Sequence, residues 1–284
     1  MKDKEQLDSS KEIIDKALKD FNPKVNVLML SGGDDSMAAL QVCKEIDVKI
    51  DFILHGNTRT GLEETTEFVR DVAKKANIPY IEADAGDSYV NYVTRKGFFG
   101  VGIKAHSFAF HVLKSEHFNK AVSQHIRKRQ RDFPILLING ARRLESENRM
   151  RTMVNPYKID PARKNNIWVN IINEWENGDP VAYLEGCGIK RNPVSVALCR
   201  SGECMCGSMQ SVENYAEAKA FSPKWGEQMD SLRKKVMEKF PWDWGTNQPK
   251  TWILEKKGQG NLFTGYHEDF QPMCSGCKTN FFKE

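Results

Sequence analysis

The sequence lacks the features of a membrane or exported protein. No apolar run among its 284 residues is long enough to span a bilayer, and its charged beginning, MKDKEQLDSSKE, has no apolar stretch of the signal-peptide type. Internal repeats and low-complexity tracts are also absent. With 40% hydrophobic and 28% charged residues, the composition predicts a globular protein of the cytoplasm that has no membrane partner.

Cysteine is scarce in most of the chain, and five of the seven cysteines follow residue 198. Disulfides are not expected in a reducing compartment, so this clustering indicates metal binding or catalysis. Close-set thiols from two distant segments can build a four-ligand cage. The candidate metal ligands are Cys199, Cys204, Cys206, Cys274 and Cys277.

Several uses of the thiols stay open. The five candidates are compatible with a 4Fe-4S cluster, with a structural zinc ion, or with free thiols, one of which relays sulfur. Cys43 lies in an apolar helical pattern and is expected in the core, whereas Cys187, in the loop EGCGIK, is a candidate persulfide carrier. The six histidines show no metal-ligand spacing.

The net charge of +4 is too small to identify a partner, but its distribution is uneven. Between His125 and Lys164, eleven Lys and Arg residues stand against four Asp and Glu residues. This local excess of positive charge suits a polyanionic ligand.

Short apolar runs alternate with helical patterns in the first half of the chain. The runs at 25–30, 49–54, 80–83 and 135–138 are bounded by Gly, Asn, Asp or Pro, as buried parallel strands are. Apolar spacing predicts helices at 7–21, 36–46, 62–76 and 108–129. This order predicts an α/β fold with a doubly wound, mainly parallel sheet that binds ligands at the carboxyl ends of its strands.

The pattern changes near residue 180 to helices, several tryptophans and loops rich in Gly and Cys. We therefore expect two domains: a nucleotide-binding domain at 1–180 and a helical, cysteine-bearing module at 181–284. Trp168, Trp175 and Tyr183 have a spacing compatible with packing on helix faces.

The segment LSGGDDS, residues 30–36, follows a predicted strand and opens a predicted helix. In that context Gly32 and Gly33 permit a tight turn whose backbone N–H groups face an anion. Ser31 and Ser36 add hydroxyl donors, and the helix adds the positive end of its dipole. The alternative is an ordinary turn with a helix cap.

Two carboxylates in this loop, Asp34 and Asp35, are unsuited to direct contact with phosphate. They fit a site in which Mg²⁺ lies between a carboxylate and the phosphate oxygens. The loop is not a Walker A motif, because the GK[ST] ending is absent.

LSGGDDSMAAL resembles the SGGxDS signature of the PP-loop ATP pyrophosphatases, which cleave ATP between its α and β phosphates. The resemblance implies an adenine nucleotide alpha-hydrolase-like fold, ATP and Mg²⁺ as cofactors, and Asp35 and Ser36 as catalytic residues. It also implies a nucleotide-binding set that begins with Leu30, Ser31, Gly32, Gly33, Asp34, Asp35 and Ser36.

A second segment, HGNTRTGLEETTEFV, resembles the D-T-G … P-E-T … F segment of the phosphoadenylyl-sulfate reductase-like branch. That branch contains sulfonucleotide reductases, sulfate adenylyltransferase small subunits and the sulfur-inserting enzymes of DNA phosphorothioation. His55, Gly56 and Asn57 replace the usual residues, so Gly56 and Asn57 are expected to contact the nucleotide through their backbone.

A third segment, NGARRLESENR, resembles the G-x-R-x-x-E-S-x-x-R motif of the same branch. It implies that Gly140 and Arg142 bind the nucleotide, that Arg142 and Arg149 bind phosphates or a charged acceptor, and that Glu145 and Ser146 orient them. Guanidinium groups suit this role because they are planar and permanently charged. The alternative is a solvated basic helix start.

The resemblance is strongest to the phosphorothioation enzymes and implies the following reaction. The enzyme adenylylates an anionic acceptor, the DNA backbone phosphate, and sulfur then displaces the activated oxygen. This implies a cysteine desulfurase as sulfur donor and a 4Fe-4S cluster on the C-terminal cysteines.

Three other functions stay open at this stage. A sulfonucleotide reductase is an alternative, although its E-C-G-x-H nucleophile is absent and Asp35, which such enzymes tend to lose, is present. A tRNA-thiolating PP-loop enzyme and a non-enzymatic nucleic-acid-binding protein with a structural metal are the others. The oligomeric state is open, with a homodimer as one option.

Overall fold

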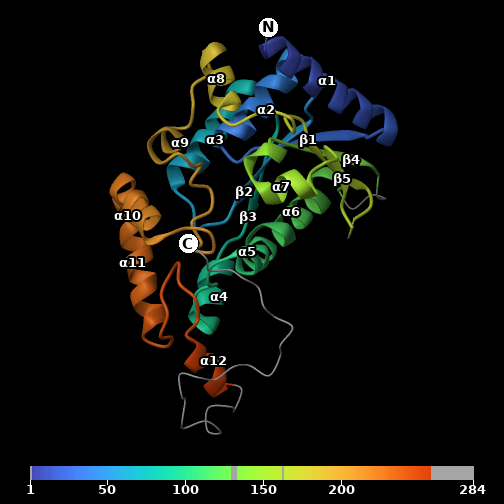
Figure 1. Cartoon of the computed structure of the whole chain (residues 1–284). Helices are drawn as coiled ribbons and strands as arrows, with labels where there is room; N and C mark the ends of the chain where they lie inside the picture. The colour runs from blue at the N-terminus through green and yellow to red at the C-terminus, as the bar shows by residue number, and fades with distance from the viewer. Residues whose placement is uncertain (1, 129–132, 162, 257–284) are drawn as a thin grey trace. The chain divides into compact units, whose positions relative to one another are not determined.

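A six-stranded sheet forms the centre of the computed structural model, which describes residues 2–128, 133–161 and 163–256 (Figure 1). The strand order is β3-β2-β1-β4-β6-β5, and only β5 runs antiparallel, on β6. The strands are β1 Val25–Met29, β2 Phe52–Asn57, β3 Tyr80–Asp84, β4 Ile135–Asn139, β5 Tyr157–Ile159 and β6 Asn166–Asn170. The predicted fold, a doubly wound and mainly parallel α/β sheet, is confirmed.

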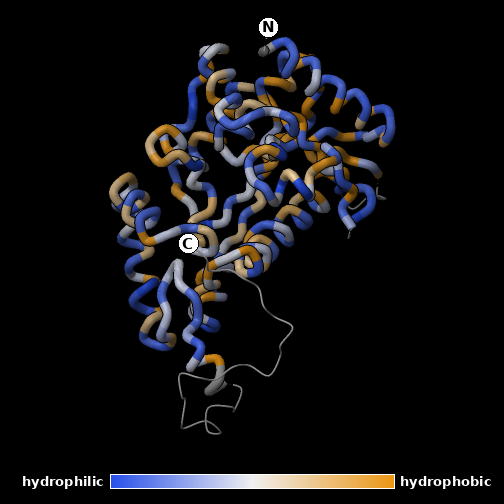
Figure 2. Tube along the Cα trace, in the orientation of Figure 1, coloured by the Kyte–Doolittle hydropathy of each residue, from blue (hydrophilic) through white to orange (hydrophobic). Residues whose placement is uncertain are grey.

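Two hydrophobic cores lie on the two faces of the sheet, because neighbouring residues of a strand point to opposite sides. Leu28 belongs to the core beneath α1 Lys2–Phe21, α2 Asp34–Glu45, α3 Glu63–Ala76 and α8 Asp179–Gly186. Its neighbour Val27 packs with residues of the helical run that covers the other face. Figure 2 shows hydrophobic residues concentrated along the strands between these layers.

The helical run on the second face contains two π-helical stretches. It consists of α5 Ile103–Phe110, η1 His111–Ser115, α6 Glu116–Ala121 and η2 Val122–Ile126. The predicted helix at 108–129 therefore begins earlier, since Gly102, with a φ of 110°, forms its N-cap. π-Helical turns are rare and concentrate at functional sites.

Strands β5 and β6 were not predicted. In β6 the sequence NIWVN has a short apolar run between asparagines, which is a weak strand signal. Trp168 consequently lies on a strand rather than on a helix face, and Trp175 follows the strand in a turn region. Tyr183 lies on α8 as expected, and its ring packs edge-on against Trp175 at 5.0 Å between centroids.

The part after residue 180 is helical: α9 Pro193–Leu198, α10 Val212–Phe221, α11 Pro223–Met237 and α12 Lys250–Lys256 follow α8. Between β3 and α5 lies α4 Ser88–Lys96, and after β4 come the 3-10 turn η3 Arg143–Glu145 and α7 Glu147–Thr152. The described residues up to Asn247 form one compact unit, and those from Gln248 on belong to a second. The predicted domain boundary near residue 180 stays a prediction. Among the described helices, none combines the length and apolar character needed to cross a bilayer.

Candidate functional site

The loop between β1 and α2 is ordered by its own serines. The Ser36 hydroxyl donates to the Gly33 carbonyl at 2.9 Å and accepts from the Ser31 amide at 3.2 Å. Gly32 has a φ of 80°, a conformation that glycine adopts without a steric penalty. His55 lies behind the loop, with its Nδ1 2.8 Å from the Leu30 carbonyl, so this nitrogen carries the proton.

A cavity of about 640 Å³ opens at the carboxyl ends of β1, β2 and β4. Most of the predicted site residues line it: Leu30, Ser31, Gly33, Asp34, Asp35, Ser36, Gly56, Gly140, Arg142, Arg149 and Cys199. Two predicted residues point elsewhere. The Gly32 carbonyl accepts from the Asn192 side chain at 3.0 Å, and the Asn57 amide donates to Glu82 at 2.7 Å.

Asp35 and Arg142 form an ion pair in the cavity wall, with 3.0 Å between Oδ1 and Nε. Arg142 is 7% exposed and also donates to the Glu176 carbonyl and the Asn177 side chain, each at 3.0 Å. Burial raises the pKa of Asp35 above its usual value, and the guanidinium of Arg142 opposes that shift. Three acceptors thus fix one arginine, which in turn holds the carboxylate at the beginning of α2.

The neighbouring carboxylate, Asp34, is held by Arg191 in a two-pronged contact, with both N–O distances 2.9 Å. Arg191 also contacts Glu185 at 3.2 Å. The sequence left open which of the two loop carboxylates faces a magnesium ion, and Asp34 already has a permanent cation as partner. Arg191 was not predicted, because only the fold brings it next to a residue 157 positions away.

The segment from Arg191 to Glu203 packs along the loop. Asn192 is fully buried, and its side chain bonds to Gly32 and, at 3.1 Å, to the Thr65 hydroxyl. The hydroxyl of Thr65 donates to the Ser201 carbonyl. The region after residue 180 therefore supplies part of the cavity wall.

Arg149 lines the cavity from α7 and pairs with Glu145. Ser146 caps α7, since its hydroxyl accepts from the Arg149 amide at 3.3 Å. The hydroxyl of Ser146 thus has a structural role in starting the helix, which places Arg149 at the cavity.

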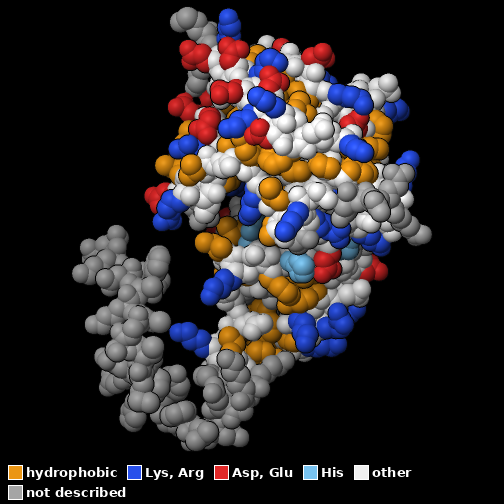
Figure 3. Space-filling view, turned by 90° about the vertical axis from the view of Figure 1, so that its right-hand side faces the viewer, with side chains coloured by type: hydrophobic (Ala, Val, Ile, Leu, Met, Phe, Trp, Pro, Cys, Tyr) orange, Lys and Arg blue, Asp and Glu red, His pale blue; other side chains and the backbone are white. Residues whose placement is uncertain are grey.

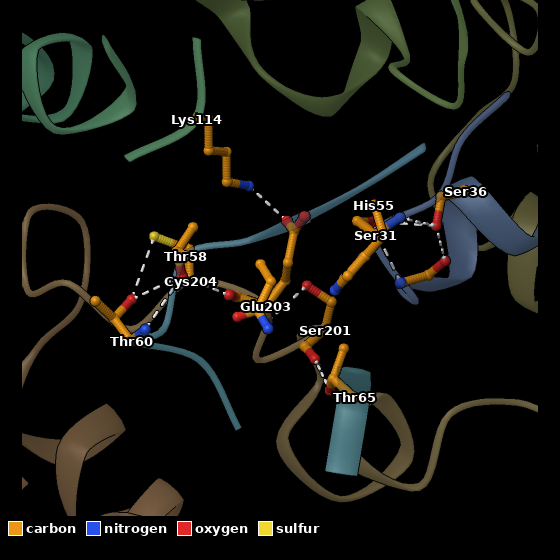
Figure 4. A network of polar contacts seen from close by, with 12 residues as sticks. Ser31, Ser36, His55, Thr58, Thr60, Thr65, Lys114, Ser201, Glu203 and Cys204 are labelled. Carbon is orange, nitrogen blue, oxygen red and sulfur yellow. Dashed lines mark hydrogen bonds and ion pairs between the residues drawn. The ribbon is translucent and has the colours of Figure 1, made fainter. Parts of the chain in front are cut away.

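Lys114 and Glu203 form a second ion pair in the wall, with 2.5 Å between Nζ and Oε2 (Figure 4). Lys114 projects from the π-helical turn η1, and Glu203 comes from the cysteine-rich loop. Burial lowers the pKa of Lys114, but the charge and hydrogen bond of Glu203 together with the nearby Cys204 and Cys206 raise it above its usual value, so the lysine stays protonated. Neither residue was predicted. Lys114 lies on a π-helical turn, which leaves no clear pattern in the sequence, and Glu203 reaches the cavity only through the fold.

One side of the cavity is apolar and aromatic. Met29 and Leu54 form its base, and Phe110, Phe118 and Trp168 stand around it. A flat heteroaromatic base can stack there while its phosphates reach the serine loop.

Among the described cysteines, Cys199 is the one that lines the cavity. Cys199 is exposed at the end of α9. The thiol of Cys204 accepts a hydrogen bond from the Thr60 hydroxyl at 3.7 Å, and the thiol of Cys206 lies 3.2 Å from the Ser208 hydroxyl. The neighbouring thiol of Cys206 lowers the pKa of Cys204, while the thiol of Cys204 and burial raise the pKa of Cys206. Across the described ranges, no group of three or more His, Cys, Asp or Glu side chains is arranged to hold a metal ion.

The remaining cysteine predictions have different outcomes. Cys274 and Cys277 lie outside the described residues, so the metal cluster stays a prediction. Cys43 is buried in the core beneath α2, as predicted, and burial raises its pKa to about 12. Cys187 is exposed at the end of α8.

The sheet and the serine loop at the end of its first strand place this chain in the adenine nucleotide alpha-hydrolase-like class of α/β proteins. Residues 25–208 match the family described as "Phosphoadenosine phosphosulfate reductase domain". The chain belongs to this family, which is a family of nucleotide-binding enzymes.

Three solved structures show distant similarity to the chain. A phosphoadenylyl-sulfate reductase from Candida auris has a TM-score of 0.46 and 14% identity, with 66% of this chain and 83% of that chain covered. An NH3-dependent NAD synthetase from Campylobacter jejuni has a TM-score of 0.46 and 13% identity, with 95% and 98% covered. The U34-tRNA thiolase of Methanococcus maripaludis, with its [4Fe-4S] cluster, has a TM-score of 0.44 and 11% identity, with 83% and 76% covered. Comparison with curated proteins gave no match.

Proposed function

We propose that this chain is an ATP pyrophosphatase that adenylylates an anionic acceptor, the DNA backbone phosphate, so that sulfur can be inserted. The main support is the pair formed by Asp35 and Arg142, which holds a carboxylate beside the serine loop in the cavity wall. A carboxylate at this place can bind the metal ion that accompanies a polyphosphate. In a site that only binds a sulfonucleotide, the same charge would repel the ligand.

The loop supplies the anion cradle of the proposed reaction. Ser31 and Ser36 provide hydroxyl groups, and the beginning of α2 provides backbone N–H groups and the positive end of the helix dipole. An acceptor oxygen attacks the α-phosphorus, the bond to the bridging oxygen breaks, and pyrophosphate leaves. The sulfur donor then attacks the acceptor phosphorus, and AMP leaves with the displaced oxygen.

Asp35 is the residue that would hold Mg²⁺. The ion neutralises charge on the phosphate oxygens when bound. Magnesium commonly binds through one or two carboxylates plus substrate phosphates, so a single carboxylate at the loop is sufficient. Of the five cysteines proposed to hold a four-iron cluster, Cys199, Cys204 and Cys206 are among the described residues, and Cys274 and Cys277 are not.

The proposed acceptor, DNA, is supported by the positive charge near the cavity, and the proposed sulfur donor by the need of the reaction for activated sulfur. Eleven basic residues against four acidic ones between His125 and Lys164 suit the phosphates of DNA, and Arg149 brings part of this charge to the cavity. A cysteine desulfurase would deliver the sulfur as a persulfide, whose terminal sulfur bonds to the phosphorus, and an added thiol reductant then supplies the two electrons that cleave the S–S bond and leave the phosphorothioate. Thiolation of tRNA remains an alternative, because it uses the same activation of an acceptor oxygen.

A second candidate function is sulfonucleotide reduction. It is favoured by the family to which residues 25–208 belong, and by the Cys204 thiol near Lys114 behind the cavity wall. In that reaction a thiolate attacks the sulfur of a sulfonucleotide and sulfite is released after a second thiol resolves the intermediate. It requires no pyrophosphate release from ATP.

These two functions are separated by their products. Anaerobically purified protein is incubated with ATP and Mg²⁺, with and without DNA and a cysteine desulfurase, and pyrophosphate and AMP are measured. A parallel reaction contains phosphoadenylyl sulfate and a dithiol, and sulfite is measured. The variant Ser36→Ala is expected to lose release of pyrophosphate and AMP, which supports the proposal. Ser123→Ala, at a half-buried position outside the loop, is the control and is expected to retain it. Release of sulfite without pyrophosphate and AMP overturns the proposal.

Replacing Arg191 with alanine is expected to raise the KM for MgATP about tenfold while kcat changes less. Without its partner, the Asp34 carboxylate at the loop repels the triphosphate. Combining Arg191→Ala with Asp34→Asn removes both charges and is expected to restore the KM. Steady-state kinetics of pyrophosphate release measure both variants, and an equal KM in the single and double variants would show that the pair does not act through charge.

A further inference from the structure

The segment 88–115 has an unusual composition. It contains no Asp or Glu, but four Lys and Arg, two His and six aromatic residues. It forms α4, α5 and the loop between them, and it reaches the cavity through η1. Basic residues interleaved with aromatic ones are typical of surfaces that bind single-stranded nucleic acids.

Helix α5 is apolar and yet mostly uncovered. Ile103, Phe108 and Phe110 are 74%, 46% and 42% exposed, and Ala109 is its buried residue. An apolar helix of a globular protein normally buries such side chains against a neighbour. In Figure 3, the lower part of the described molecule carries hydrophobic side chains next to Lys, Arg and His side chains.

The aromatic rings on this surface are fixed in position. Tyr92 and Phe99 stack with their centroids 4.4 Å apart, and Phe108 packs against both at 5.5 and 5.9 Å. The neighbouring Phe98 is buried, and its carbonyl accepts from the Trp242 indole at 3.0 Å. Because the rings are already held in place, the protein would lose little conformational entropy when a partner stacks on them.

The surface leads directly to the cavity. Phe110 is both exposed and part of the cavity wall, and Lys114, about one helical turn later, lies inside. Arg95 and Lys104 are exposed on the same segment. A chain that follows this surface meets aromatic rings and cations before it reaches the Asp35 carboxylate.

We propose that a docking surface for single-stranded DNA, the α4–α5 surface, is formed by Tyr92, Arg95, Phe99, Lys104, Phe108 and Phe110. The bases stack on the rings, and the basic side chains contact the phosphates. Duplex DNA does not fit this surface, because its bases already stack on each other and only their edges face outward. The choice of DNA rests on the proposed function, whereas the preference for unpaired bases rests on the rings.

The test is fluorescence anisotropy of a labelled oligothymidylate of about 15 nucleotides, without ATP. Wild-type protein is expected to bind it more tightly than the matching duplex or RNA. The double variant Phe108→Ala with Phe110→Ala is expected to bind about tenfold more weakly. Lys104→Gln with Arg95→Gln is expected to reduce the slope of log affinity against log salt by about 1.4.

Two controls match these variants. Lys19→Gln with Lys44→Gln removes the same charge from exposed positions on α1 and α2, and Val212→Ala shortens an exposed apolar side chain on α10. Both are expected to bind like the wild type. Failure of the wild type to bind, equal binding of duplex, tighter binding of RNA, or unchanged binding by the Phe variants overturns the inference. Because ATP is absent, none of these results depends on pyrophosphate release.

Discussion

Replacing Asp35 with asparagine is expected to reduce pyrophosphate release from MgATP by about a hundredfold to a thousandfold. The asparagine keeps an oxygen that can accept the hydrogen bond from Arg142, which is 3.0 Å away. It loses the charge that would hold magnesium against the phosphates. The change therefore removes the chemistry proposed for this residue and leaves most of the local geometry intact.

The rate is measured as pyrophosphate release at several magnesium concentrations, and folding is followed by thermal unfolding. Asp71→Asn on the exposed side of α3 is the matched control and is expected to retain full activity. A rate for Asp35→Asn close to that of the wild type would contradict the metal role. A large fall in melting temperature would instead show that the carboxylate acts mainly by neutralising the buried Arg142.

The sequence was sufficient to locate the serine loop and the strands β1 to β4, three of which end at the cavity. These elements combine short apolar runs with glycine at turns, so the local signal and the fold agree. The edge formed by β5 and β6 was missed, because β5 has only three residues and the apolar run of β6, IWV, is three residues long between two asparagines. Such short runs carry little periodicity.

The site residues that the sequence analysis missed were missed for a different reason. Arg191 and Glu203 come from a region assigned to a separate module, and Lys114 from a helix whose π-helical turn sets its direction. Each acts through a partner far away in the sequence, so only the fold shows the contact. Motifs identify residues that belong to one loop, whereas ion pairs across the cavity depend on how segments pack.

Replacing Gly140 with alanine is expected to destabilise the protein by about 3 kcal/mol and to abolish most ATP turnover. A Cβ at this position would lie 2.2 Å from the Asp35 carbonyl oxygen and 2.9 Å from the Ser36 amide nitrogen. Both are backbone atoms of the serine loop, which cannot rotate away as a side chain can. The sequence assigned Gly140 to nucleotide binding. The structure adds that a larger residue at this position would clash with the backbone of the serine loop.

Thermal unfolding and pyrophosphate release measure the two effects, and a fall of about 6 to 12 °C in melting temperature is expected. Gly186→Ala is the matched control, because its Cβ would meet open space in helix α8 and stability should be unchanged or slightly higher. Equal stability of the two variants would mean that the loop shifts at little cost. If Gly140→Ala keeps its stability but loses turnover, the loop tolerates the shift, and catalysis requires the loop conformation seen here.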